Sequence, residues 1–480
     1  MRRSFLMNQE KAHKFRWLSL AAVGLFSFMS TLDGSIVNIA LPTISEDIGV
    51  PMNQSEWVVS VYLMAICVFL LFFGKVGDSF GKIKVFKIGT IVFIIGSFLC
   101  GIPGSLGLLL ASRVVQAIGA SMTMATSTGI ITEIFPLQER GRALGLIGSF
   151  VSLGAIAGPG IGGVILSHFN WSYIFWINVP VGIITMMFGW YFLPKTEFKS
   201  GEKIDYIGFI LFALFIMLFF GGIFLGQEKS FTNPLIIGMV IVSLISLVMF
   251  YRYENKQESP LVHFHLFSNQ IFTVSLLTAT LIFVTNFFAN VVNPFYLQNV
   301  LGLEANIAGF LMMVFPLVMV VGAPLSGYLT DKKGPHLITL IGLVLLTLGQ
   351  IGYLVLGESS PVILFILIMS LVGAGNAMFQ APNNTIIMSS VDKSEYGVAG
   401  SMNALARNFG MVVGISLSTT ILYQSMSFEM GERVVGFIDG RPDIFVYGMH
   451  FTYMVSFAIC LFATGITFWR FSKAKKEMKK

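Results

Sequence analysis

The sequence predicts an all-α membrane protein of fourteen transmembrane helices, in which two pseudo-symmetric six-helix bundles flank two inserted central helices. Composition, recurring apolar runs and the distribution of positive charge predict this class. The apolar fraction is 55% and the charged fraction only 11%, whereas a soluble domain has about 45–50% apolar and about 25% charged residues. We therefore expect no separate water-soluble domain in this chain.

Apolar runs recur along the chain, and a spanning helix needs about 20 mostly apolar residues. The first run is too long for a signal peptide and has no small-residue cleavage site. The expected spans, in order, are 17–41, 56–74, 85–102, 106–131, 141–165, 172–193, 204–226, 233–251, 271–295, 307–329, 336–357, 361–386, 397–423 and 447–470. They define an N-terminal bundle (15–193), two inserted helices (204–251) and a C-terminal bundle (268–471).

The basic residues predict the orientation, because cytoplasmic loops are rich in Lys and Arg. With both termini inside, the inside segments hold 25 of the 30 basic residues. The outside loops hold only Lys229, Arg433 and Arg441, and two others, Arg113 and Arg407, lie within spans. We therefore expect a multi-pass protein of the cell membrane with cytoplasmic termini. The lipid bilayer then explains the net charge of +6, and no nucleic-acid partner is expected.

An internal repeat relates the two bundles. Parallel repeats with a substrate site between them near the midplane are typical of transporters that work by alternating access. The matching residues are Gly74, Asp78 and Gly81 with Gly327, Asp331 and Gly334; Gly141, Gly154 and Gly158 with Gly397, Gly410 and Gly414; and Asn38 and Pro42 with Asn290 and Pro294.

Several segments resemble those of the major facilitator superfamily. The glycine–aspartate segments after the second and tenth spans are similar to its signature, and the segments 32–42, 175–182 and 294–298 resemble its fourteen-helix drug:proton antiporter branch. The resemblance covers roughly residues 17–470. It implies multidrug efflux driven by protons, and hence antibiotic resistance, but it does not specify a substrate.

Asp33 and Arg113 are charges inside the first and fourth spans. At 1.5 Å per residue they lie about 12 Å and about 10 Å from the same membrane face. Charges at such depth usually face the bundle interior and have partners, so we expect them to pair and to couple proton movement. A static ion pair is the alternative. The repeat places uncharged Thr285 and Met369 at the matching positions, which favours coupling, and the resemblance implies proton transfer for Arg113.

Small residues in the fifth span predict close helix packing, and the proline predicts a kink. The resemblance implies that such a seam marks exporters and seals the contact between the bundles; ordinary packing is the alternative. The residues are Gly154, Gly158, Pro159, Gly162 and Gly163.

The short loop after the second span is a candidate latch. Its aspartate is expected near cationic side chains, which could hold one closed state and release it in another; a basic loop that only sets topology is the alternative. The expected gating residues here are Gly74, Asp78, Gly81, Lys82, Arg140 and Arg142, with Lys84 nearby.

Polar residues within the spans are candidates for a substrate cavity or for contacts between helices. The many Phe and Met residues suggest an adaptable apolar surface around them, and Arg407 could attract an anionic or zwitterionic group. The candidates are Asn38, Trp57, Tyr62, Gln116, Asn178, Asn286, Asn290, Gln380, Asn384 and Arg407.

Other chemistry has little support. The three Cys residues are scattered with no metal-ligand spacing, His263 and His265 are interpreted as part of a solvated loop, and no nucleotide-binding loop occurs. We therefore expect neither metal nor cofactor, only a proton gradient as energy source, and a secondary transporter in place of an enzyme.

We expect a monomer that exports small amphipathic molecules in exchange for protons. An exporter of an endogenous lipid or metabolite is the first alternative. A nutrient importer is the second, although Gly158 and Pro159 argue against it. A non-transporting membrane sensor or scaffold is the third.

Overall fold

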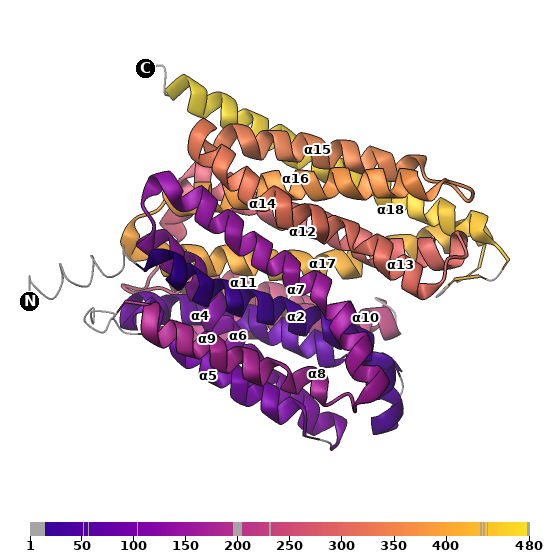
Figure 1. The fold of residues 1–480 in the computed structure, drawn as a ribbon, viewed down its shortest axis with the longest axis horizontal. Helices are drawn as coiled ribbons and strands as arrows, with labels where there is room; N and C mark the ends of the chain where they lie inside the picture. Colours follow the sequence, from indigo (N-terminus) through magenta and orange to yellow (C-terminus); the bar gives the residue numbers. More distant parts are fainter. Residues whose placement is uncertain are drawn as a thin grey trace, which may run out of the picture.

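The computed structural model describes residues 15–477 except positions 51, 56, 103, 195–203, 230–231, 433, 435–436 and 439. Within these residues there is no β-strand, and fourteen helices are long and apolar enough to cross a membrane. The predicted fold class is therefore confirmed. Both the start of the first span and the end of the last lie at one end of the molecule (Figure 1), which we call the termini side; the other end is the distal side.

The helices match the fourteen expected spans closely. The N-terminal half contains α2 (Arg16–Ile48), α3 (Met52–Ser55), α4 (Trp57–Phe80), α5 (Lys82–Cys100), α6 (Leu106–Ile134), η1 (Leu137–Glu139), α7 (Arg140–His168), α8 (Tyr173–Trp176) and α9 (Asn178–Phe192). The inserted pair is α10 (Tyr206–Lys229) and α11 (Pro234–Glu254). The C-terminal half contains η2 (Phe264–Ser268), α12 (Gln270–Phe295), η3 (Tyr296–Val300), α13 (Ala305–Met312), α14 (Val314–Lys333), α15 (Pro335–Val355), α16 (Val362–Ser389), η4 (Lys393–Glu395), α17 (Tyr396–Met430) and α18 (Pro442–Glu477).

Local sequence explains the helix boundaries. Gly81 and Gly334 have φ values of 101° and 84°, a region that non-glycine residues rarely adopt, and they turn the chain into α5 and α15. Ser105 caps α6 by accepting a hydrogen bond from the Leu108 N–H. The tenth expected span is divided into α13 and α14 at Met313.

Figure 1 shows the two halves as separate groups of helices, indigo to magenta and orange to yellow, running side by side. In the N-terminal half, α2 packs on α7 and α5 packs on α6; in the C-terminal half, α12 packs on α17 and α15 packs on α16. Across the halves, α7 packs on α14, and α17 packs on α4 and α6.

The inserted pair contacts both halves. On one side, Phe209 of α10 lies 4.7 Å from the ring of Phe72 in α4. On the other, Phe219 of α10 stacks on Phe409 of α17 at 5.7 Å. Aromatic pairs at such distances add to the packing free energy. α10 therefore covers the junction between α4 and α17 with phenylalanine rings.

Close contacts between the halves gather at the termini side. A Cβ on Gly74 of α4 would overlap the Ser401 side chain of α17, and a Cβ on Gly145 of α7 would overlap the Ala323 carbonyl of α14. Toward the distal side, a Cβ on Gly160 or Gly163 of α7 would meet nothing within 4 Å. The structure is therefore a conformation in which the termini side is closed.

Candidate functional site

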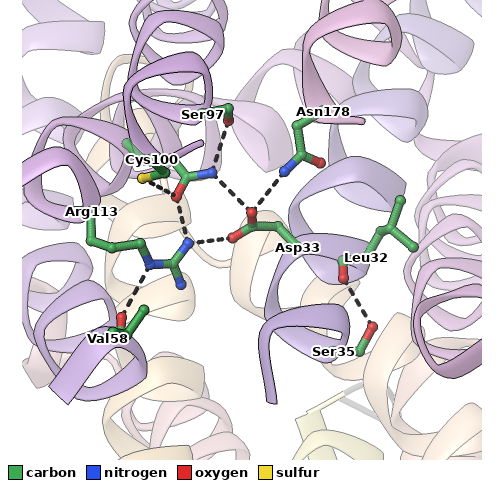
Figure 2. Close-up of polar contacts among 9 residues, drawn as sticks. Leu32, Asp33, Ser35, Val58, Ser97, Cys100, Arg113 and Asn178 are labelled. Carbon is green, nitrogen blue, oxygen red and sulfur yellow. Dashed lines mark hydrogen bonds and ion pairs between the residues drawn. The ribbon is translucent and has the colours of Figure 1, made fainter. Parts of the chain in front are cut away.

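Asp33 is the centre of a buried polar network in the N-terminal half (Figure 2). Its Oδ2 lies 2.8 Å from Nη1 of Arg113. Its Oδ1 accepts hydrogen bonds from Nε2 of Gln116 at 2.9 Å and from Nδ2 of Asn178 at 2.7 Å. Asp33 and Arg113 are both 0% exposed. The expected pairing of these two charges is therefore present, and helices α2, α6 and α9 each contribute to it.

Arg113 also binds α4. Its Nε donates to the Val58 carbonyl at 3.1 Å, and its guanidinium lies 3.9 Å from the centre of the Tyr62 ring. A desolvated cation over an aromatic face is stabilised by the ring quadrupole. The ion pair between α2 and α6 is thus attached directly to α4.

Gln116 and Asn178 occupy places other than those expected. Both are expected in the substrate cavity, but both are 0% exposed and both donate to Asp33. Gln116 also donates to Ser97 Oγ at 2.8 Å and accepts a hydrogen bond from Arg113. The structure turns these amides toward the charge inside the bundle, where they help to satisfy a buried carboxylate. Tyr62, a third cavity candidate, is also part of this buried network, because its ring lies against Arg113.

In the C-terminal half, the region that corresponds to the Asp33–Arg113 pair holds neutral side chains. Tyr453 donates to Asn293 Oδ1 at 2.5 Å, and Asn293 Nδ2 lies 3.3 Å from the Tyr353 hydroxyl. The Tyr353 hydroxyl also donates to the sulfur of Met369 at 2.9 Å, the residue that aligns with Arg113. Asn293 is not among the expected site residues, although it is a fully buried amide within an expected span.

Two aspartates link the halves at the termini side, each at the start of a helix in the other half. Asp78, near the end of α4, accepts hydrogen bonds from the Gly397 and Val398 N–H groups of α17, both at 2.8 Å. Asp331, near the end of α14, accepts from the Gly141 N–H at 2.9 Å and the Arg142 N–H at 3.1 Å in α7. Carboxylates are stabilised at helix N-termini.

The partners of Asp78 differ from those expected. Lys82 forms a salt bridge with it at 2.9 Å, as the sequence analysis anticipates, but the guanidinium groups of Arg140 and Arg142 lie over the rings of Tyr396 and Trp17. Two backbone N–H groups of α17 also contact Asp78. Asp331 is missing from the expected gating set, although its alignment with Asp78 in the repeat is a signal that could have found it.

The glycine seam of α7 packs within its own half. A Cβ on Gly154 would overlap the Phe28 carbonyl of α2, one on Gly158 would overlap Ser35, and one on Gly162 would lie 2.8 Å from Ile36. A Cβ on Gly163 would meet nothing within 4 Å. In this conformation the seam therefore joins α7 to α2, not to the other bundle. α7 is helical through position 159, but the side chain of Pro159 lies outside the described residues.

The other cavity candidates are distributed along the spans. Asn38 and Asn290 are exposed in the distal halves of α2 and α12, and Trp57 contacts Phe224 of α10. Asn286 exchanges two hydrogen bonds of 2.7 Å with Asn376. Asn384 accepts from Asn403. Gln380 is half-buried in α16.

Arg407 of α17 is half-buried. It forms neither an ion pair nor a hydrogen bond with any residue that the structure describes. Polar groups left open within a span usually face a water-filled space. Arg407 therefore stays a candidate for the wall of the transport pathway.

One group of described residues has donors placed for a metal ion. His263 Nδ1 and His265 Nε2 lie 3.5 Å and 3.3 Å from the same Glu395 oxygen. The sequence analysis assigns both histidines to a solvated loop, but they contact η4 just before α17. The expectation that no metal is needed stays a prediction.

Comparison with known proteins identifies the family, because residues 23–415 match the Major Facilitator Superfamily. The chain is a member of the major facilitator superfamily. The riboflavin transporter RibZ of Clostridioides difficile is 34% identical over 97% of this chain and 100% of its own length. The multidrug transporter protein MdtP of Bacillus subtilis is 27% identical over 91% of this chain and 81% of its own.

A solved structure of the superfamily's proton:xylose symporter XylE has a TM-score of 0.65 and 13% identity, and the match covers 95% of this chain and 96% of that one. At this identity it supports the fold alone. Since its relatives in the superfamily are transporters, this chain is a membrane transporter of small molecules and not an enzyme. The fourteen helices agree with the fourteen-helix branch.

Proposed function

We propose that this superfamily member exports small amphipathic molecules in exchange for protons, and that Asp33 carries the proton. The observation that carries the proposal is the fully buried Asp33–Arg113 pair, which the C-terminal half replaces with neutral groups. Multidrug proteins among the relatives support export of amphipathic molecules.

The chemistry at Asp33 makes proton binding and rearrangement inseparable. Arg113, Gln116 and Asn178 all point hydrogens at the carboxylate, so the arrangement fits an ionised Asp33. A proton on either oxygen would face a donor instead of an acceptor. A buried cation that loses its counter-charge is costly. Protonation therefore favours a different arrangement of Arg113 and of the helices it holds.

Helix α4 offers a route from this site to the latch. Val58 and Tyr62 of α4 hold Arg113, and Asp78 lies on the same helix, sixteen positions after Tyr62 and so about 24 Å further along. A change at Arg113 that tilts α4 would pull Asp78 away from the start of α17. A rigid helix that has two positions is the physical element such coupling needs.

The orientation follows from charge. With the basic loops inside, the termini side faces the cytoplasm, and the conformation described above is closed on that side. In that state substrate would leave to the outside, and protonation of Asp33 would favour return to the inward-facing state.

The test is transport in inside-out proteoliposomes with an imposed pH gradient. The wild type is expected to accumulate a cationic dye or a drug from a substrate panel when the lumen is acidic. A protonophore should abolish accumulation. If accumulation is unchanged when the gradient is removed or reversed, the proposal of proton-driven export is wrong.

A second candidate is transport of riboflavin or a similar flat heterocycle. The full-length match to a riboflavin transporter favours it. A competition experiment distinguishes the two candidates. If riboflavin is a substrate that uses the same pathway as the dye, excess riboflavin should block dye flux, and labelled riboflavin should cross the membrane. Absence of riboflavin flux in active proteoliposomes would eliminate this candidate.

A further inference from the structure

Arg470 is a buried cation near the end of α18 on the termini side, far from the Asp33 network. It is 2% exposed, and its Nε and Nη2 have no hydrogen-bond partner. Only Nη1 is bonded, to Ser275 Oγ and, at 3.4 Å, to Asn383 Oδ1. Among the residues that the structure describes, no carboxylate forms a salt bridge with it.

A cavity of about 380 Å³ opens beside this guanidinium. It lies between the start of α12 and the end of α18, where the α12 backbone begins at Gln270. Lys473 at its edge bonds Gln270 at 2.5 Å and lies over the Trp469 ring. The residues around it are Ser268, Asn269, Gln270, Ile271, Trp469, Arg470 and Lys473.

Arg470 and Lys473 place two cations at this cavity, while the Asn269 side chain accepts hydrogen bonds from the Ile271 and Phe272 N–H groups at the start of α12. A second cavity of about 360 Å³ shares Asn269 and Ile271 with the first and reaches His336 of α15, whose Nδ1 has no partner. The start of α12 also directs the positive end of its dipole to this region. Arginine recognises phosphate through two parallel N–H donors, and two guanidinium nitrogens of Arg470 have no hydrogen-bond partner among the described residues.

Burying a charge without a partner is expensive, and nothing in the described part of the chain balances Arg470. We propose that this cavity binds a phosphate group, which supplies the missing negative charge. Lys473 gives a second cationic contact at the entrance. Trp469 is 50% exposed at the same place, as is typical of aromatic residues at a membrane–water interface. A phospholipid headgroup and free phosphate share this chemistry.

The test measures thermal unfolding and lipid retention of the full chain in maltoside detergent micelles, which contain no phosphate. One arm adds phosphatidylglycerol and the other adds inorganic phosphate. We expect at least one addition to raise the Tm of the wild type, and Arg470→Gln to lose that gain and to bind about tenfold more weakly or worse. A gain from phosphatidylglycerol alone identifies a lipid headgroup; a gain from phosphate alone identifies the free anion.

Two further variants keep the test decisive. Lys473→Gln changes an exposed side chain, should fold normally, and should weaken binding even if Arg470→Gln does not fold. Lys332→Gln, an exposed cation at the termini side of α14, is the matched control and should bind like the wild type. The proposal is overturned if the added lipid or phosphate raises the Tm of the wild type and of both pocket variants equally. It is also overturned if Lys332→Gln loses as much of this gain in Tm as the pocket variants do, or if neither addition raises the Tm of the wild type.

Discussion

At the scale of single residues, the arrangement around Asp33 makes the protein sensitive to loss of one charge but tolerant of losing both. Arg113 is held by Asp33, Gln116 and the Val58 carbonyl, with no water-exposed surface. Removing one member of a buried ion pair leaves an uncompensated charge, whereas replacing both with neutral groups is often close to neutral in stability.

We therefore predict that Arg113→Met lowers the free energy of unfolding by about 3–5 kcal/mol. The double variant Asp33→Asn/Arg113→Met should recover most of that loss, because no buried charge is left. Thermal or denaturant unfolding of the four proteins in a double-mutant cycle measures this. A double variant no more stable than Arg113→Met would mean that the pair is not isolated from solvent or from other charges.

The sequence predicts the pairing of Asp33 and Arg113 because depth in a membrane follows from position along a helix. It does not predict that Gln116 and Asn178 face the same carboxylate, because helix rotation depends on packing against neighbours. Amide residues are equally suited to a cavity wall and to a buried network. Their placement therefore needed the three-dimensional fold.

At the scale of helices, two aspartates make matching contacts between the halves. Asp78 caps α17 and Asp331 caps α7, so each half holds the start of a helix in the other. Loss of a capping group costs about 0.5–2 kcal/mol. Such a contact is strong enough to bias two conformations and weak enough to be released during transport.

We predict that Asp78→Asn increases opening of the termini side, because the amide lacks the negative charge that favours the helix N-terminus. Ser401, which faces Gly74 across the closed contact, reports this when replaced by cysteine in a protein without its three native cysteines. Maleimide labelling of that cysteine should become about 5–30-fold faster, as expected for a shift of one or two kcal/mol. An unchanged rate would show that Asp78 does not hold this side closed.

The glycines of α7 allow a comparison within one helix. Gly145→Ala places a methyl group against the Ala323 carbonyl of α14, whereas Gly163→Ala places one in open space. Because packed helices do not yield easily, we predict that Gly145→Ala reduces transport by hindering closure while Gly163→Ala keeps near-normal transport. Equal transport rates at matched expression would argue against a tight α7–α14 contact during the cycle.

The sequence identifies α7 as a closely packed helix but not its partners. Gly154, Gly158 and Gly162 contact α2 in the same half, while Gly141 and Gly145 contact α14 in the other. Small residues allow close approach from any direction, and nothing in their spacing names the neighbour. The bounds of the spans were easier to predict, because length and apolarity depend on the chain alone.

At the scale of the whole molecule, two halves with one fold have different interiors. The N-terminal half holds a buried ion pair, and the C-terminal half holds a neutral cluster of Asn293, Tyr353, Tyr453 and Met369. The inserted α10 covers the α4–α17 junction, a role that composition alone does not reveal. The unequal halves support the proposal that the proton is handled on one side of the transport pathway.

The central claim is that Asp33 couples protons to transport and is more than a structural contact. The most direct measurement compares substrate exchange with gradient-driven accumulation in proteoliposomes that contain Asp33→Asn. We predict that the folded fraction of this variant still exchanges labelled for unlabelled substrate but no longer accumulates substrate in response to a pH gradient. Uphill accumulation by Asp33→Asn would contradict the account, and so would the loss of both activities in a variant that is folded and binds substrate.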